Sequence, residues 1–257
     1  MCYDIISEVP MDKRLKTILE LITQNKTMSV VSLSEKLGVS QVTIRKDLNK
    51  LEKLGMIKRE HGYAKLNGED NISNRLSYHY EAKTQIALKA IESVEDGETV
   101  MIESGSCCAL VARALATYRK DITIITNSAF ICDYIRNYDV NLILLGGTYQ
   151  KEAQVTVGPL TINEANNFFV NYYFIGTDGF SEKTGFTGKD YMRCMTVAQL
   201  AKQAKKVVIV TESEKFGKVG TMNLLPNHDI YGVVTDQGIS EEMKQILVDQ
   251  EIKVFMA

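Results

Sequence analysis

The chain has 257 residues, of which 45% are hydrophobic and 24% charged, and its formal net charge is −2. This length is sufficient for two domains with ordinary hydrophobic cores. No apolar run approaches the length of a membrane span, no signal-peptide pattern opens the chain, and the five cysteines show neither metal-ligand spacing nor a disulfide framework. The composition therefore argues against membrane and disulfide-stapled secreted proteins, and we expect a cytoplasmic one.

The charge is unevenly distributed along the chain. Residues 11–66 contain 12 lysines and arginines against 6 aspartates and glutamates, whereas residues 67–257 contain 18 basic and 24 acidic side chains. A small basic module joined to a larger acidic one suggests that only the first contacts a phosphate backbone. A short lysine-rich helical domain gives the same balance, so charge alone leaves nucleic-acid binding at roughly even odds.

Three helices are predicted in the basic module. The first spans about Asp12 to Thr23, and a short second one, Ser32 to Leu37, leads into a tight turn at Gly38-Val39. The third, Ser40 to Gly55, has a capping serine, a glycine stop and an apolar stripe at helical spacing. A helix, a tight turn and a cationic second helix form the arrangement that enters the major groove of DNA. The stripe consists of Ile44, Leu48, Leu51 and Leu54, and the opposite face of Gln41, Arg45, Lys46, Asn49, Lys50 and Lys53.

Two short strands about a glycine-containing turn are predicted after this helix, at residues 56–59 and 63–66, and would form the wing of a winged helix. His61 lies in that turn, where it can reach a phosphate or the minor groove. The polar residues that follow predict a linker over residues 67–77. We therefore expect a DNA-binding domain at residues 11–66 and a second domain at residues 78–257.

The second domain alternates short apolar strands with helices, which predicts a largely parallel α/β sheet covered on both faces. Strands are predicted at residues 99–103, 122–125, 141–145, 172–176, 206–210, 230–234 and 252–255. Helices are predicted at residues 80–94, 107–118, 128–137, 191–204 and 240–249.

Almost every predicted strand of this domain ends in a small polar cluster. In open α/β sheets, ligands bind outside the carboxyl ends of the strands. Ser104-Gly105-Ser106 opens a helix and offers amides to an anion, Lys215 adds a positive charge, and Asn127 and Asp178 can bind hydroxyl groups. Each loop alone is ordinary turn chemistry, but five at one edge favour a site for a polyol phosphate. The candidate residues are Ser104, Gly105, Ser106, Asn127, Gly146, Gly147, Asp178, Gly179 and Lys215.

The cysteines and histidines carry weaker signals. Cys107 and Cys108 lie at a helix start, which lowers a thiol pKa and would suit a redox sensor. Cysteine is also a common small buried residue, and without an evident resolving partner we favour that interpretation. His79 and His228 show no ligand spacing, so we expect no metal and no cofactor. A histidine placed to activate a hydroxyl is lacking as well, which argues against acyl transfer.

At these residues the chain resembles the DeoR family of bacterial transcription regulators. The similarity is carried by V-S-Q-V-T-I-R-K-D-L at residues 39–48 and R-E-H-G-Y-A at 59–64, and in the second domain by T-N-S at 126–128, G-G at 146–147 and F-I-G-T-D-G at 174–179. It implies an N-terminal winged helix-turn-helix and a C-terminal sensor that resembles ribose-5-phosphate isomerase in fold. Members usually repress sugar-catabolic operons and respond to phosphorylated sugar intermediates.

Three motifs depart from the family pattern. Tyr63 replaces the second glycine of the wing motif H-G-G-A, and S-G-S-C at residues 104–107 stands where the family has S-G-T-T. The usual D-S-S-K reads E-S-E-K at 212–215, whose extra carboxylates oppose a nearby phosphate. These departures bear on the affinity for the effector and on its identity.

The favoured hypothesis is a repressor of a carbohydrate-utilisation operon that binds operator DNA as a homodimer or homotetramer under control of a phosphorylated sugar or sugar alcohol. The expected DNA-contacting residues are Ser40, Gln41, Thr43, Arg45, Lys46, Asn49, Lys50, Lys53, Arg59 and His61. A sugar-phosphate isomerase with an accessory DNA-binding head is the alternative. It lacks support because Asp178-Gly179 continues as Phe180-Ser181 rather than as an acidic cluster that could supply a base. A vestigial sensor with constitutive DNA binding is a third possibility.

Overall fold

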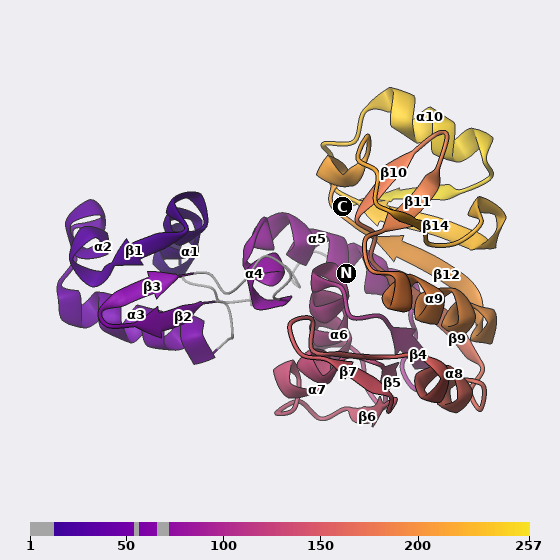
Figure 1. Ribbon diagram of the computed structural model, residues 1–257, viewed down its shortest axis with the longest axis horizontal. Coiled ribbons are helices and arrows are strands. Elements are labelled where there is room, and N and C mark those ends of the chain that lie inside the picture. Colours follow the sequence, from indigo (N-terminus) through magenta and orange to yellow (C-terminus); the bar gives the residue numbers. More distant parts are fainter. Residues whose placement is uncertain (1–12, 54–56, 66–71) are drawn as a thin grey trace. The chain divides into compact units, whose positions relative to one another are not determined.

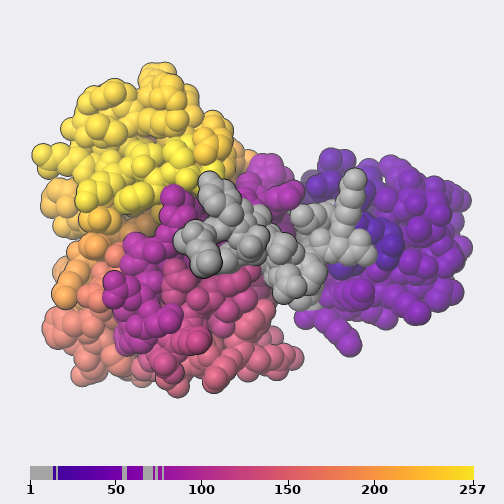
Figure 2. All heavy atoms as spheres, turned by 180° about the vertical axis from the view of Figure 1, so that it is seen from behind, coloured from indigo at the N-terminus to yellow at the C-terminus, as the bar shows by residue number. Residues whose placement is uncertain are grey.

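The computed structural model describes residues 13–53, 57–65 and 72–257 (Figure 1). The chain divides into two compact units, Met1–Tyr78 and His79–Ala257. In Figure 2 the second unit forms one continuous body from its magenta to its yellow residues. Among the described residues, no helix is long and apolar enough to cross a membrane.

In its described residues, the first unit contains a small sheet and four helices, the last of which is α4 (Ile72–Ser77). Helices α1 (Lys13–Asn25), α2 (Val30–Leu37) and α3 (Gln41–Lys53) accompany strands β1 (Thr27–Ser29), β2 (Lys58–Glu60) and β3 (Tyr63–Lys65). The predicted stripes are buried, with Ile18, Ile22, Ile44, Leu48 and Leu51 each 0% exposed. Leu54 and Gly55, predicted as the end of the third helix, lie outside the described residues. The wing hairpin is confirmed, and β1 extends it to a three-stranded antiparallel sheet in the order β1-β3-β2.

The linker prediction is wrong for part of its length. Ile72–Ser77 forms a helix, α4, which lies against α1. Ile72 and Leu76 are each 0% exposed. Their spacing of four residues gives α4 one apolar face, and its burial stabilises a helix that the polar composition concealed. Residues 66–71 of the predicted linker region are outside the described residues.

The second unit is built on a seven-stranded sheet whose neighbouring strands are all parallel. All seven predicted strands are confirmed, with ends shifted by one or two residues. The order across the sheet is β15 (Lys253–Met256), β14 (Ile230–Thr235), β12 (Ala204–Val210), β9 (Val170–Ile175), β4 (Thr99–Ile102), β5 (Thr123–Thr126) and β6 (Asn141–Leu144).

The predicted helices of this unit are confirmed as well. They are α5 (Tyr80–Ala90), α6 (Ser106–Tyr118), α7 (Ala129–Tyr134), α9 (Tyr191–Leu200) and α10 (Glu241–Asp249), and short 3₁₀ turns extend α5 and α9 to Ser93 and Gln203. Several short elements were not predicted: helix α8 (Pro159–Ala165), the hairpin of β7 (Thr148–Gln150) and β8 (Val155–Val157), and a small sheet of β10 (Gly179–Ser181), β11 (Gly185–Gly188) and β13 (Met222–Asn223).

The strand order reverses between β4 and β9. From β4 the chain proceeds through β5 to β6 on one side, and β9 then starts the series β12, β14 and β15 on the other. Such a reversal opens a crevice outside the carboxyl ends of the two central strands. The loops after β4 and β9 follow the two central strands of the sheet, and those after β5 and β12 follow the neighbouring strands on either side.

Candidate functional site

The turn between α2 and α3 is fixed by local hydrogen bonds. Gly38 adopts the left-handed conformation, φ 64° and ψ 28°, and its amide donates to the Ser34 carbonyl. The Ser34 hydroxyl donates to the Val39 carbonyl over 2.6 Å. Glycine is favoured at this position because a β-carbon makes the left-handed conformation costly. These contacts hold α2 and α3 as a helix-turn-helix.

Ser40 caps α3 as predicted. Its hydroxyl accepts a hydrogen bond from the Thr43 amide over 3.2 Å and lies 3.0 Å from the Thr43 hydroxyl. Ser40 is exposed, whereas Thr43 is half-buried. The first turn of α3 therefore presents polar groups, its amides included, of the kind that contact a DNA phosphate.

The outward face of α3 carries the predicted side chains. Its inner face packs into the core and includes Asp47, which is 2% exposed and accepts a hydrogen bond from Arg14 Nε over 2.6 Å. Because it is buried and paired with Arg14, Asp47 adds no exposed negative charge to the outer face of α3. Six of the predicted contact residues are exposed on the outer face: Gln41, Arg45, Lys46, Asn49, Lys50 and Lys53.

The wing brings the last two predicted DNA contacts to the surface. Arg59 is half-buried and donates from its guanidinium to Asn49 of α3, so the wing and the helix are tied together. His61 is exposed in the wing turn with φ 46°. Glu60 has its pKa lowered by hydrogen bonds from Lys65 and Lys58. Those two lysines thus balance a carboxylate on the wing.

Sequence reasoning missed one exposed apolar residue on this surface. Val42 is 59% exposed at the start of α3, between Gln41 and Thr43. An apolar side chain there can contact the methyl group of thymine. The sequence did contain a signal for this residue, because Val42 is apolar but falls outside the stripe of Ile44, Leu48 and Leu51.

In the second unit the predicted effector residues all follow strands of the parallel sheet at its carboxyl edge. Residues 104–106 follow β4, Asn127 follows β5, residues 146–147 follow β6, residues 178–179 follow β9 and Lys215 follows β12. The structure therefore brings all of these loops to one edge of the sheet. Their individual contacts differ from the expectation in several places.

The carboxylate of Glu103 lies between the loops that follow β4 and β9. Its Oε2 accepts hydrogen bonds from the amides of Gly105 over 2.7 Å and Gly176 over 3.3 Å, and its Oε1 from the Ser104 hydroxyl over 2.8 Å. In this structure the Gly105 amide and the Ser104 hydroxyl thus already donate to an internal carboxylate, which the sequence did not predict. Only Ser106, half-buried at the first position of α6, keeps its predicted setting. Sequence reasoning counted Glu103 only as the end of a strand.

Lys215 lies in a group of charged side chains after β12. Its ammonium is 3.1 Å from Glu214 Oε1, and Lys218 Nζ is 3.6 Å from the same oxygen. The other oxygen, Oε2, lies 3.8 Å from His79 Nδ1. Burial lowers the pKa of Lys215, but the charges of Glu212 and Glu214 outweigh it, so its pKa is raised and the ammonium stays charged.

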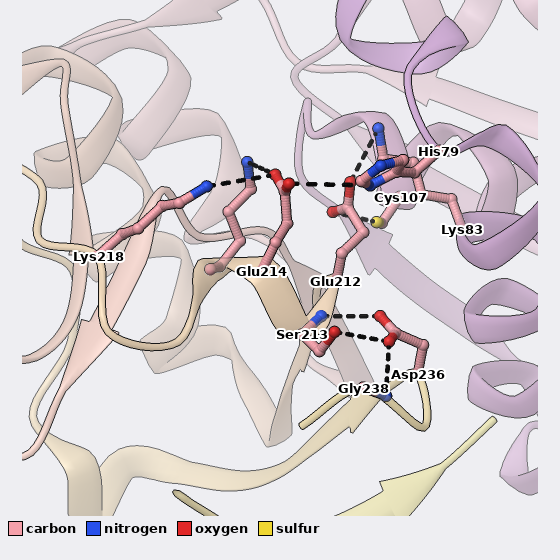
Figure 3. A network of polar contacts seen from close by, with 10 residues as sticks. His79, Lys83, Cys107, Glu212, Ser213, Glu214, Lys218, Asp236 and Gly238 are labelled. Atoms are coloured by element: carbon pink, nitrogen blue, oxygen red, sulfur yellow. Dashed lines mark hydrogen bonds and ion pairs between the residues drawn. The ribbon is translucent and has the colours of Figure 1, made fainter. Parts of the chain in front are cut away.

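A buried ion pair lies beside this group. Lys83 Nζ of α5 is 3.0 Å from Glu212 Oε1, with side chains 3% and 6% exposed. Cys107 Sγ donates to Glu212 Oε2 over 3.4 Å (Figure 3). Burial, with the Glu212 charge, raises the pKa of Cys107, and burial with the Glu103 charge raises that of Cys108. The redox-sensor interpretation of these cysteines therefore loses its basis, since a sensor needs a thiolate.

The remaining candidates are partly committed to structural contacts. Asn127 is 2% exposed and donates to the Thr156 carbonyl over 2.8 Å, while its Oδ1 has no hydrogen-bond partner among the described residues. Asp178 Oδ2 accepts from the Lys189 amide over 2.8 Å.

The remaining candidate glycines, Gly146, Gly147 and Gly179, lie where the chain is closely packed. Gly146 donates from its amide to Glu164 over 2.5 Å. A β-carbon on Gly147 would lie 2.1 Å from the Thr161 hydroxyl, and one on Gly179 would lie 2.3 Å from the Lys218 carbonyl.

One group among the described residues has the spacing of a metal site. Ligand atoms of His79, Glu212 and Glu214 lie within 4.8 Å of one another. Each of the two carboxylates is, however, paired with a lysine ammonium. Ammonium groups already balance these charges and would repel a cation, so the arrangement fits a salt-bridge network better than a metal centre.

Comparison with known proteins gives consistent results for both units. Residues 14–70 match the model of the DeoR-like helix-turn-helix domain, and residues 78–237 match that of the DeoR C terminal sensor domain. The chain is 30% identical to the HTH-type transcriptional regulator GlpR of Haloferax volcanii over 91% of this chain and 92% of that protein. It is 27% identical to the glycerol-3-phosphate regulon repressor of Escherichia coli over 94% and 97%.

A further relative is the L-fucose operon activator of Escherichia coli, with 26% identity over 87% of this chain and 94% of that protein. Among solved structures, ribose 5-phosphate isomerase A from Methanocaldococcus jannaschii matches with a TM-score of 0.40 and 18% identity, over 53% of this chain and 54% of that one.

Proposed function

The chain belongs to the DeoR family of transcriptional regulators, and we propose that a phosphorylated sugar or sugar alcohol, bound by its second unit, controls operator binding by its first. It is a DNA-binding regulator and not an enzyme, as its named relatives are regulators too. Asp178, the nearest candidate for an isomerase base, accepts a hydrogen bond from the Lys189 amide. We assign DNA reading to residues 11–66 and effector sensing to residues 78–257.

The exposed face of α3 is the observation that carries the DNA-reading part. Arg45 and Lys46 would contact base edges or phosphates, and Gln41 would pair through its side-chain amide with adenine. Thr43, Lys50 and Lys53 would anchor the phosphate backbone, with Ser40, Asn49, Arg59 and His61 at the rim. Two half-sites call for two such surfaces, so we propose a homodimer or homotetramer.

The charge and the polar atoms at the carboxyl edge of the sheet support the choice of effector. Lys215 and Lys218 supply positive charge for a phosphoryl group. Asn127 keeps a buried oxygen without a partner among the described residues, which suits a hydroxyl donor. The relative named as a glycerol-3-phosphate regulon repressor favours a phosphorylated polyol and repression as the mode of control.

Two measurements test this proposal. In a gel-shift titration at fixed salt concentration, the protein should bind its own promoter region at least tenfold more tightly than random DNA. In thermal shifts with a panel of sugar and sugar-alcohol phosphates, one compound should raise the melting temperature of the second unit and weaken promoter binding. A ligand at 100 times its Kd adds about 2.7 kcal/mol of stability. Equal affinity for promoter and random DNA would contradict the proposal of operator binding. If no compound of the panel raises the melting temperature, the proposal of effector binding is contradicted.

A further inference from the structure

Glu214 is at the centre of a group of positively charged and titratable side chains. Both lysines of the loop, Lys215 and Lys218, lie within 3.6 Å of its Oε1, and His79 Nδ1 lies 3.8 Å from its Oε2. In Figure 3, Glu214 stands between Lys218 on one side and His79 on the other. The side chain is a quarter exposed, at 25%, so an anion from solvent can reach the same lysines.

The charges in this group reinforce one another. Burial raises the pKa of Glu214, but the hydrogen bond from Lys215 and the charges of Lys215, Lys218 and His79 outweigh it and lower the pKa. Glu214 is thus ionised at neutral pH and holds the two ammonium groups that a phosphoryl group would need. A phosphoryl group carries a charge between about −1.5 and −2 and three acceptor oxygens, against one charge and two oxygens for a carboxylate.

We propose that Glu214 competes with the effector for Lys215 and Lys218. The phosphoryl group of the effector displaces Glu214 from these two lysines, and Glu214 then gives up its contact with His79. This inference rests on the proposed function and adds a route by which the bound effector acts. A ligand shifts a conformational equilibrium only through different contacts in the two states, and the exchange of Glu214 for phosphate provides such a difference.

His79 is well placed to transmit the change. It is the first residue of the second unit, directly joined through Tyr78 to the first unit, and it precedes the first turn of α5. Its backbone is left-handed, φ 49° and ψ 37°, a conformation that is uncommon for residues other than glycine. Such conformations persist where surrounding contacts hold them, and they concentrate at switch regions.

The buried ion pair of Lys83 and Glu212, one helical turn after His79, anchors α5. Lys83 and Glu212 are both almost fully buried and 3.0 Å apart, so the body of α5 stays attached to the loop after β12. Loss of the His79 contact would then alter the chain just ahead of this anchor. Local rearrangement of the entry to α5 is the expected consequence, and the segment leading to the DNA-binding unit begins there.

The test compares inorganic phosphate binding in four full-length proteins by thermal shift. Glu214→Gln should lower the half-saturating phosphate concentration about tenfold relative to the unmodified chain, because a competing charge is removed. Lys215→Gln should abolish the response. Glu92→Gln is the matched control, since Glu92 also pairs with a lysine, over 2.6 Å, but lies in the 3₁₀ turn after α5. It should leave the phosphate response unchanged.

Promoter binding provides the second readout. In His79→Ala, phosphate or the effector found in the panel should still bind, but its effect on promoter affinity should shrink at least threefold. If Glu214→Gln and the unmodified chain have equal half-saturation while Lys215→Gln loses the response, the effector site stands and the competition is refuted. If no protein responds to any phosphate compound, both the site and this inference fail. Matching melting temperatures without phosphate would show that the variants are folded.

Discussion

Removal of one charge from the buried pair of Lys83 and Glu212 should destabilise the second unit strongly. Glu212→Gln keeps the size of the side chain but removes the carboxylate charge that lies 3.0 Å from the Lys83 ammonium, whose side chain is 3% exposed. Breaking a buried ion pair costs about 3–5 kcal/mol, because the charge that remains is held away from water. For a unit of this size that corresponds to a fall in melting temperature of roughly 6–20 °C.

The burial of the ion pair, rather than the distance between its two charges, should determine how much stability is lost. The pair of Lys89 and Glu92 is closer, at 2.6 Å, but its side chains are 33% and 62% exposed. Exposed pairs contribute about 0–1 kcal/mol, because water and salt screen them and two side chains must be ordered. Glu92→Gln is therefore the matched control, and it should change the stability several-fold less than Glu212→Gln.

Calorimetry of the full chain would measure both variants, together with the double variant Lys83→Met, Glu212→Gln. The double variant removes the buried ammonium together with the carboxylate, so it should recover most of the loss. The unfolding transition of the first unit serves as an internal reference and should not move. The reasoning is refuted if Glu212→Gln costs no more than Glu92→Gln, or if the double variant is less stable than Glu212→Gln.

Three further predictions concern the DNA surface, the first unit and the thiols. Arg45→Ala should weaken promoter binding by about 1–3 kcal/mol and relax specificity at its base pair, whereas Lys205→Ala, on the second unit, should leave the gel-shift titration unchanged. Asp47→Ala should destabilise the first unit by about 1–3 kcal/mol, seen as a lower urea midpoint, because the part-buried hydrogen bond between Arg14 and Asp47 is lost; an unchanged midpoint would contradict this. Burial raises the pKa of Cys194 to about 11 from the usual 9.0, so iodoacetamide should label it slowly at pH 8. The folded state then keeps a proton that the unfolded state releases, and the unfolding free energy should fall as the pH rises from about 9 to about 11. Rapid labelling at pH 8 would refute the burial argument.

The sequence predicted the long and periodic elements of both units. In α3, a serine cap and an apolar stripe at Ile44, Leu48 and Leu51 are signals contained within thirteen residues. The seven strands of the parallel sheet are short apolar runs, and each is recognisable by itself. Local patterns suffice there because the same residues that form the element also bury its face.

The short elements escaped prediction because tertiary packing stabilises them. β1 and β7 have three residues each and α4 has six, too few for a period to be distinguished from chance. α4 depends on burial of Ile72 and Leu76, within a segment whose composition is that of a linker. β1 is a strand because β3 pairs with it, and that pairing joins residues more than thirty positions apart.

For the proposed sites, the sequence alone predicted which two surfaces bind DNA and effector. The exposed face of α3 and the loops at the carboxyl edge of the sheet follow from periodicity and from the rule for parallel sheets. Only the tertiary structure decided which groups contact one another at this edge. Glu103 accepts a hydrogen bond from the amide of Gly176, 73 residues away, and Glu214 contacts His79, from which most of the sequence of the second unit separates it. A local sequence pattern identifies a charged residue in a loop. It does not identify the residue that this side chain contacts, because the folding of the whole sheet brings that partner near.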